Sequence, residues 1–436
     1  MKSRMFQIVC VITFLTLVSA CAPQAATQVP TAPATEAATS APEVAATATE
    51  QAPVTITWWV PDWDQPTVEK LLTGFEAENP NITVNLVTTT WDTMQNQIYL
   101  GLQGSNPPDL ITELEARISG YAEQGLLTNL DQYVASSTDF TKDDVVPSAL
   151  DMNSYNGSLY GIPFRHDGTG VYYNKGMFKA AGLDPDNFPT TWDELMQDSV
   201  KLTTNGQYAT AWPFGNQSNA VTRFQIQLFT YGGQILSDDG KTCTLDTPAA
   251  LQAMNSLVDT MTTSKIASPS SMEIDNTALR ELFVNKKIAW YISGAFDIDT
   301  IQQEAPDIQL GTAVLPGVNG MGVTEVDGFS MIIPAGAAHK DAAWKLADYI
   351  ARDANMAELT ATFPARKSAM SMDKFKAPLL QPFIKQLDQG KSEAAYTKWP
   401  QMETIIYTYM QKAILGSIST QDAMTNITHE INQVLQ

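Results

Sequence analysis

Two carboxylates flank an aromatic ring at a point in this 436-residue sequence where an expected strand ends. The residues are Asp62-Trp63-Asp64, directly after the strand expected at 54–60. An indole can stack on an apolar C–H face while carboxylates accept hydrogen bonds from hydroxyl groups, so these residue types suit a carbohydrate ligand. Asp64 could instead cap the following helix, and Trp63 could pack within the fold.

Two acids follow another expected strand, which ends near Thr112. Glu113 and Glu115 stand at its carboxyl end, where α/β folds place their ligands. We treat both acids as candidates for ligand contacts. They could also form the acidic first turn of a helix. Arg117 could either pair with one of these carboxylates or contact a sugar.

Three consecutive polar residues, Arg165-His166-Asp167, precede an apolar strand expected at 171–173. Their side chains are candidates for binding a polar ligand. A catalytic role for His166 and Asp167 would need a nucleophile, and the sequence has no serine or cysteine nucleophile motif.

Amide and aromatic side chains supply the remaining candidates that residue type alone suggests. Asn216 and Gln217 follow an expected strand and offer hydrogen-bond donors and acceptors. Trp399 stands at an expected helix start, where it is either another stacking platform or an apolar staple beside the helix.

The elements that carry these residues alternate between strand-like and helix-like stretches, which is the rhythm of an α/β fold. Strands are expected at 54–60, at 82–88 and from 107 to about 112, and helices at 65–78, 94–103 and 118–124. A βαβαβα unit of this kind forms a doubly wound lobe, which binds ligands at the carboxyl ends of its strands.

The N-terminus has the pattern of an export signal. Lys2 and Arg4 are followed by an apolar stretch at 5–17 that is too short to be a comfortable transmembrane helix. The next residues, Val18-Ser19-Ala20-Cys21, resemble the bacterial lipobox, which implies removal of residues 1–20 and attachment of lipid to the Cys21 sulfur. An ordinary secretory peptide cleaved after Ala20 is the alternative.

Residues 21–53 are expected to form the lipidated cysteine and a tether. The stretch after Cys21 is nearly all Ala, Thr, Pro, Gln, Glu and Ser, so it cannot bury enough apolar surface to fold, and we expect it to be disordered and extended. Cys10 leaves with the signal and Cys21 takes the lipid, which leaves Cys243 without a partner for an intrachain disulfide.

The sequence is strongly acidic, with a formal net charge of −21. This charge argues against nucleic acid, anionic lipid or a strongly anionic ligand as partners. The sequence has no phosphate-binding loop, no HExxH motif and no cluster of cysteine and histidine. We therefore expect neither a metal nor a cofactor.

Beyond the tether, short motifs occur in an order that resembles the family 1 extracellular solute-binding proteins. They include Ile56-Thr57-Trp58-Trp59, Gly161-Ile162-Pro163, Tyr172-Tyr173-Asn174-Lys175, Thr191-Trp192-Asp193-Glu194-Leu195, Leu315-Pro316-Gly317 and Trp399-Pro400-Gln401-Met402. The resemblance covers nearly all of the chain after the tether. It implies the type II periplasmic-binding fold, in which two α/β lobes enclose a ligand cleft and the chain crosses the hinge several times.

The resemblance also implies where the lobes divide. The crossings are expected near 162–166, 308–311 and 363–365. The first lobe is then 54–163 plus 310–363, and the second lobe is 164–309 plus 364–436.

Several further candidates come from the resemblance. Asp167 stands where relatives carry a sugar-binding acid, and Phe296-Asp297 stand where relatives carry a stacking aromatic residue, often Trp, followed by a polar residue. Asp327 precedes a glycine in a segment where relatives let the backbone approach the ligand. Arg366, beside the third crossing, is expected to contact a sugar hydroxyl or to form a hinge salt bridge.

The function that the resemblance implies is that of the substrate-binding subunit of an ABC importer. We expect a monomer outside the cytoplasm, anchored to the membrane through Cys21, that captures a sugar or oligosaccharide and delivers it to the permease membrane subunits. It would not be an enzyme. The alternatives are a sensor or adhesin lipoprotein with the same fold, a non-sugar ligand such as a polyamine, and an anchored glycoside hydrolase with paired carboxylates.

Overall fold

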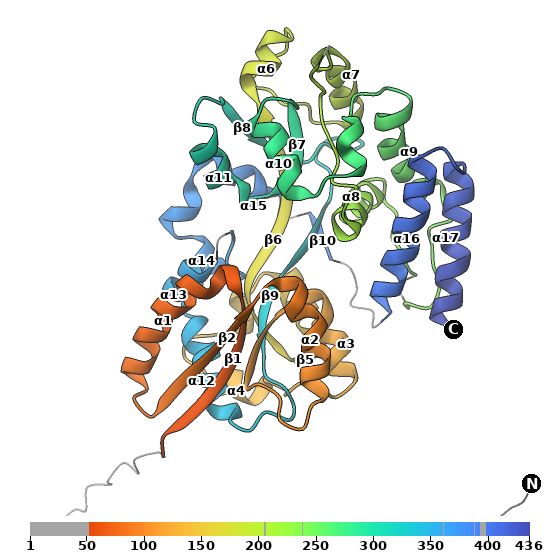
Figure 1. The fold of residues 1–436 in the computed structure, drawn as a ribbon. Helices are drawn as coiled ribbons and strands as arrows, with labels where there is room; N and C mark the ends of the chain where they lie inside the picture. Colours follow the sequence, from red (N-terminus) through yellow and green to blue (C-terminus); the bar gives the residue numbers. More distant parts are fainter. Residues whose placement is uncertain (1–51, 205, 238, 361, 388, 393–397) are drawn as a thin grey trace, which may run out of the picture. The chain divides into compact units, whose positions relative to one another are not determined.

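The computed structural model describes residues 52–436 except 205, 238, 361, 388 and 393–397, and Figure 1 shows its fold. These residues belong to a single compact unit. The expected signal peptide, Cys21 and all but the last two residues of the expected tether lie outside the described residues. No helix in the described part of the chain is long and apolar enough to cross a bilayer.

The N-terminal elements follow the expected order. They are β1 (Val54–Pro61), η1 (Asp62–Asp64), α1 (Gln65–Glu78), β2 (Ile82–Thr89), α2 (Trp91–Gln103), β3 (Leu110–Leu114) and α3 (Glu115–Glu123). α1 buries Val68, Leu71, Leu72 and Phe75, which recur at helical spacing. α3 begins three residues before the expected start, so Glu115 lies in its first turn.

The middle of the chain is richer in helix. Its elements are α4 (Asp131–Ser136), η2 (Lys142–Asp144), α5 (Pro147–Met152), β4 (Ser154–Tyr155), β5 (Ser158–Leu159), β6 (Gly161–Asn174), α6 (Lys175–Ala180), α7 (Trp192–Leu202), α8 (Gln217–Thr230), α9 (Pro248–Thr262), η3 (Pro269–Met272), α10 (Asn276–Val284), β7 (Trp290–Gly294), α11 (Asp297–Glu304) and β8 (Leu310–Ala313).

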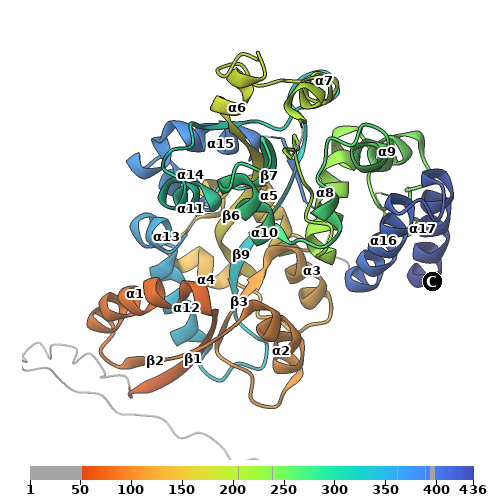
Figure 2. The same cartoon turned by 45° about the horizontal axis from the view of Figure 1, so that its top comes forward.

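The C-terminal part adds two strands to the sheet, β9 and β10, and ends in helices. Its elements are β9 (Thr324–Ile332), α12 (Lys340–Ile350), α13 (Asp353–Leu359), α14 (Lys367–Met370), η4 (Asp373–Lys376), η5 (Pro378–Leu380), α15 (Gln381–Leu387), β10 (Gly390–Lys391), α16 (Trp399–Ile414) and α17 (Thr420–Leu435). α16 and α17 lie side by side and pack against α8 and α9, as Figure 2 shows.

The main sheet has the strand order β2-β1-β3-β9-β6-β7, with β8 added to β6 and β10 to β9. β1, β2 and β3 are parallel to one another, whereas β9 runs antiparallel to both β3 and β6. The carboxyl ends of β1 and β3 therefore lie at the same edge, and they deliver η1 and α3 there.

The long strand β6 connects two parts of this sheet, as Figure 1 shows. Its first residues, Gly161 to Gly168, pair with β9. Its last residues pair with β7 from Thr169 and with β8 from Val171. The strand changes partners between Gly168 and Thr169, so that one continuous segment belongs to both parts.

Different hydrophobic clusters surround the two ends of β6. Ile162 and Phe164 belong to a cluster that also holds Trp58 of β1. Tyr172 packs with Tyr291 in a second cluster, and Val171 and Tyr173 belong to a third around Trp212 and Trp290. Burial of these aromatic side chains fixes the strand at both ends.

The structure corrects one expected crossing and refines another. The segment from 310 was expected in the first lobe, but β8 pairs with the end of β6 and Leu315 lies in the same cluster as Trp212. The chain returns along β9 instead, because the order of motifs does not reveal which strands pair. Near the third crossing, Phe363 packs in the cluster of Tyr172, whereas Ala365 packs with Ile162.

Candidate ligand-binding site

An aromatic platform lies where β1 ends. Trp63 in η1 is 48% exposed, and its ring centroid lies 6.1 Å from that of Trp91 and 6.1 Å from that of Phe329. Trp91 and Phe329 meet edge to face at 5.1 Å. Because the three rings touch one another at interplanar angles of 53° to 81°, they form a packed corner that leaves part of Trp63 accessible.

Trp91 and Phe329 were not among the sequence candidates. The expected helix at 94–103 starts too late, whereas α2 begins at Trp91, directly after β2 and Thr90. A residue that follows the carboxyl end of a strand is a candidate by the rule already applied to Trp63. Phe329 lies within β9, and only the strand pairing brings it to the platform.

Asp64 and Arg165 form a buried ion pair beside this platform. Arg165 Nη2 donates to Asp64 Oδ1 at 2.6 Å, and neither side chain is more than 6% exposed. Asp64 occupies the N-cap position of α1, but its side chain makes no capping hydrogen bond. Burial raises the pKa of Asp64 above its ordinary value, although Arg165 and the Trp63 side chain both favour the ionised form. Asp62, two residues earlier, is exposed.

His166 and Glu115 form a pair in the interior of the protein. His166 Nδ1 lies 2.7 Å from Glu115 Oε2, and His166 Nε2 lies 2.9 Å from Ser148 Oγ. Asn153 Nδ2 donates to Glu115 Oε1 at 3.2 Å. Burial by itself lowers the pKa of His166, but the Glu115 carboxylate outweighs it and raises the pKa above its ordinary value. The pair joins α3 to β6.

Glu113 is also fully buried, at the end of β3. Its Oε1 accepts a hydrogen bond from the Leu114 amide at 2.8 Å and lies 3.9 Å from Arg117 Nη1. Burial raises the pKa of Glu113, and the Arg117 charge opposes the increase. Of the two roles left open for Arg117, its contact with Glu113 corresponds to the pairing with a carboxylate.

Asp167 and Asp327 occupy paired positions on β6 and β9. Burial raises the pKa of Asp167, and Arg165 opposes the increase. Burial and the nearby charges of Glu325 and Glu115 hold the pKa of Asp327 well above its ordinary value, although Asp327 Oδ1 accepts hydrogen bonds from the amides of Gly328 and Ala116.

Glu325 and Arg223 are two charged residues that sequence reasoning missed. Glu325 lies near Arg223 and His166, and burial raises its pKa to about 7. Arg223 is 3% exposed on α8, and its Nη2 donates to Asn276 Oδ1 and to the Ile292 carbonyl oxygen. Because these two residues lie in regular elements, nothing in the local sequence singles them out.

A second exposed aromatic residue precedes a second buried acid. Phe296 is 47% exposed, and its ring lies over Gly294, where an added Cβ would meet the ring at 2.3 Å. Asp297 is buried at the start of α11, and it accepts hydrogen bonds from Arg280 Nη1 and from the Tyr291 hydroxyl, both at 2.9 Å.

Three further candidates make contacts within the protein itself. Asn216 is the N-cap of α8 and accepts a hydrogen bond from the Asn219 amide at 3.0 Å. Gln217 Nε2 donates to Glu403 and Thr404 of α16, at 3.3 and 3.2 Å. Trp399, the first residue of α16, is partly buried against the cluster around Trp212.

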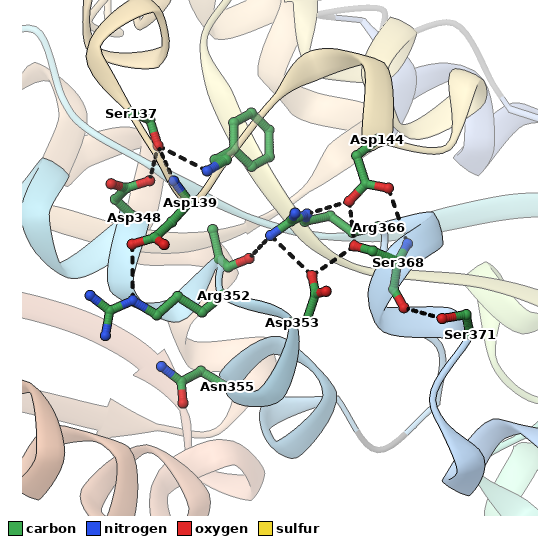
Figure 3. A network of polar contacts seen from close by, with 12 residues as sticks. Ser137, Asp139, Asp144, Asp348, Arg352, Asp353, Asn355, Arg366, Ser368 and Ser371 are labelled. Atoms are coloured by element: carbon green, nitrogen blue, oxygen red, sulfur yellow. Dashed lines mark hydrogen bonds and ion pairs between the residues drawn. The ribbon is translucent and has the colours of Figure 1, made fainter.

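Arg366 belongs to a polar network of its own, as Figure 3 shows. Its Nε donates to Asp144 at 2.7 Å, its Nη1 lies 3.2 Å from Asp353, and it also bonds the Ala351 carbonyl oxygen. Ser368 bonds the same two carboxylates. Of the two roles considered for Arg366, the contacts correspond to the salt bridge.

A cavity and the lack of a metal-ligand cluster are two further features of the described residues. A cavity of about 490 Å³ opens at the start of β1 and is lined by Val54, Tyr133 and His339 among others, whereas Trp63 follows the other end of that strand. No group of three or more His, Cys, Asp or Glu side chains in the described part of the chain could hold a metal ion.

Solved structures with a similar fold are solute-binding proteins. A solute-binding protein of an ABC transporter from Thermotoga lettingae, bound to α-D-tagatose, has a TM-score of 0.78 at 24% identity, over 88% of this chain and 100% of that one. The sugar-binding protein MalE of Xanthomonas citri gives 0.79 at 22%, over 88% and 97%. UgpB of Mycobacterium tuberculosis, in complex with glycerophosphocholine, gives 0.76 at 23%, over 88% and 98%. The fold is therefore the two-lobed α/β fold of periplasmic binding proteins.

The sequence defines the family. The profile of the bacterial extracellular solute-binding proteins matches residues 60–357, and this chain belongs to that family. A protein of Brucella abortus designated a binding protein is 28% identical over 80% of this chain and 85% of its own length. A lactose-binding protein of Rhizobium radiobacter is 25% identical over 70% and 72%, and an uncharacterised lipoprotein of Streptomyces antibioticus is 23% identical over 69% and 66%. The protein is thus a bacterial extracellular solute-binding protein, which confirms the family expected from the sequence. The structural matches confirm the expected fold.

Proposed function

We propose that this protein captures a sugar or oligosaccharide and delivers it to the permease of an ABC importer. The observation that carries the proposal is the half-exposed Trp63 ring, which rests on two other aromatic rings and adjoins the buried acid Asp64. A sugar needs an aromatic surface for its C–H face and polar groups for its hydroxyls. The tagatose-bound and lactose-binding relatives agree with this ligand class.

The arrangement of the rings favours a sugar over an alkylammonium ligand such as a choline group. A cation held by an aromatic cage needs space between the ring faces. The platform rings instead touch one another, with centroids 5.1 to 6.1 Å apart. The Arg165 guanidinium already lies 5.4 Å from the centroid of Phe329.

We further propose that the ligand binds between two lobes that meet where β6 changes partners. The first lobe would hold 54–163 and the segment from the end of β9 to 366, and the second lobe the remainder of the described chain. Phe296 and Asp297 would then supply the second side of the site. Binding would favour a closed arrangement, and small-angle scattering that shows no compaction with a bound sugar would contradict this.

Anchoring and state of assembly are part of the proposal. The protein would be a non-catalytic monomer held at the membrane by lipid on Cys21, with 22–53 as its tether. The lipoprotein of Streptomyces antibioticus supports the anchor. Metabolic labelling with a radioactive fatty acid should mark the natural protein, and Cys21→Ser should abolish the label.

A thermal-shift screen of the full-length protein in detergent tests the ligand class. The panel is maltotriose, lactose and D-tagatose, with glycerophosphocholine and putrescine as controls. A bound sugar at a hundred times its Kd should add about 2.7 kcal/mol of stability. Trp63→Ala should reduce this gain, whereas Val200→Ala, at an exposed position of α7, should not.

The other outcomes of the screen are equally informative. A shift with putrescine or glycerophosphocholine alone would keep the solute-binding function and overturn the sugar. No shift with any compound would favour a sensor or adhesin. Turnover of a chromogenic glycoside would contradict the absence of catalysis.

A further inference from the structure

Arg165 and Asp64 join two parts of the site that are distant in the sequence. Asp64 directly follows Trp63 in the chain, and Arg165 is the strand partner of Phe329 in the β6–β9 ladder. The ion pair between them is 2.6 Å long, and Arg165 Nη2 also donates to the Leu359 carbonyl oxygen at 3.3 Å.

The same guanidinium lies against the aromatic platform. Its central carbon is 5.4 Å from the ring centroid of Phe329 and 5.5 Å from that of Phe164. Phe329 in turn contacts both Trp63 and Trp91. One side chain therefore holds the carboxylate next to Trp63 and the ring against which Trp63 rests.

Stability alone is a weak reason for burying such a pair. Removing two opposite charges from water costs about as much as their attraction returns, and apolar residues of similar volume often serve as well. A guanidinium adds direction, because it offers a planar fork to a carboxylate and a flat face to an aromatic ring. Trp63 lies in a three-residue turn, where a half-exposed side chain needs neighbours to fix its orientation.

We infer that Arg165, paired with Asp64, is a positioning residue that fixes the Trp63 ring for stacking and does not itself contact the sugar. This role rests on the proposed sugar-binding function. It differs from the direct ligand contact that the sequence suggested for Arg165. Because Arg165 belongs to β6, the platform is also tied to the strand that continues into the part of the sheet around β7 and β8.

The orientation of Trp63 can be measured without any ligand. The full-length protein is labelled with 5-fluorotryptophan, and the ¹⁹F NMR signals of the platform are assigned with Trp63→Phe and Trp91→Phe. Arg165→Met should shift and broaden the Trp63 signal. Arg165→Lys should have a smaller effect, because lysine keeps the charge but lacks the planar fork.

Arg352 provides a matched control. Its guanidinium pairs with Asp139 and Glu78 and lies 4.8 Å from the Tyr349 ring centroid, so it combines ion pairing and aromatic contact as Arg165 does. Arg352→Met should leave the Trp63 signal unchanged. An unchanged signal in folded Arg165→Met, or an equal change in Arg352→Met, would overturn the inference.

A second variant protects the test against misfolding. If Arg165→Met fails to fold, the double variant Asp64→Asn/Arg165→Gln removes both buried charges and keeps a neutral hydrogen-bonding pair. The loss of the guanidinium face should still broaden the Trp63 signal, and a sharp, unshifted signal would refute the positioning role.

Binding of maltotriose separates positioning from direct contact. Arg165→Met should weaken the affinity about tenfold, because part of the stacking on Trp63 is lost when the ring is no longer held in place. In Trp63→Ala the same change should have little further effect, because there is no ring left to position. Equal losses with and without Trp63 would show direct contact and overturn the inference. If the natural protein does not bind maltotriose, the proposed ligand class is in question, and the ¹⁹F signals still decide the role of Arg165.

Discussion

Two regions of the molecule repeat the same local arrangement, but the residues that pack against it differ. In each, a half-exposed aromatic residue directly precedes a buried aspartate that pairs with an arginine: Trp63-Asp64 with Arg165, and Phe296-Asp297 with Arg280. The Trp63 ring rests on two other rings, whereas the Phe296 ring lies over Gly294. Arg165 is 6% exposed and Arg280 21%. In the first region, neighbouring rings and a buried ion pair hold the aromatic side chain in place. In the second region, the ring packs on a glycine and the ion pair is more exposed to solvent.

The largest expected difference between the regions concerns the ion pairs. Arg165→Met should lower the free energy of unfolding by about 3 kcal/mol, because it leaves Asp64 buried without its partner. Arg280→Met should cost about 1 kcal/mol, since water reaches that arginine and the Tyr291 hydroxyl still serves Asp297. Urea unfolding monitored by circular dichroism measures both, and equal losses would erase the distinction between the two pairs.

The next difference concerns ligand affinity. Trp63→Ala should weaken binding of a sugar found in the thermal-shift screen by about 2 kcal/mol, and Phe296→Ala by about 1 kcal/mol, because an indole offers a larger stacking surface than a phenyl ring. Isothermal titration calorimetry gives both values. Phe296→Trp is the matched gain-of-surface variant, and a loss of affinity in it would show that the second site is shaped for a phenyl ring.

More of the first region than of the second could be predicted from the residues alone. β1, α1 and β2 were expected to within a residue of their bounds, because their signals are local periodicities. Trp63 and Asp64 follow from the rule that ligands bind where strands end. The pairing of Arg165 with Phe329 could not be foreseen, because it depends on the ladder between β6 and β9 and on the register shift between Pro163 and Arg165.

The second region was found only through a resemblance. Phe296 and Asp297 were selected because relatives carry similar residue types there, while Arg280 and Tyr291, which hold Asp297, were missed. Partners of a buried acid come from whichever elements pack against it, and the local sequence does not encode that choice. The same limit explains the wrong assignment of 310–313, which only the β6–β8 pairing reveals.

The packing of the Phe296 ring on Gly294 can be tested by adding a side chain at Gly294. Gly294→Ala should destabilise the protein by about 1.5 kcal/mol and displace the Phe296 ring, because the new Cβ would meet that ring at 2.3 Å. Gly176→Ala in α6 is the control, since its Cβ meets only Asn174 Oδ1 at 3.2 Å. If both substitutions leave the thermal midpoint and sugar affinity unchanged, Gly294 does not shape the Phe296 site.

A pH experiment extends the comparison to Glu325, a partly buried acid in a different environment. Asp64 and Asp297 each have a guanidinium within 3 Å, whereas among the described residues no cation lies within ion-pairing distance of Glu325, and burial raises its pKa from 4.5 to about 7 despite the charges of Arg223 and His166. A raised carboxyl pKa means that the folded state holds the proton more tightly than the unfolded state does.

The stability that Glu325 contributes is therefore fully present below pH 4.5 and is lost as the pH rises to about 7. Glu325→Gln should remove this loss, by an amount on the order of 1 kcal/mol after solvent screening. Urea midpoints at pH 4.5 and pH 7.5 measure it, with Glu281→Gln on α10 as the control carboxyl. If the natural protein and Glu325→Gln change in parallel, Glu325 titrates like an ordinary acid, and the distinction between acids with and without an ion-pair partner does not hold.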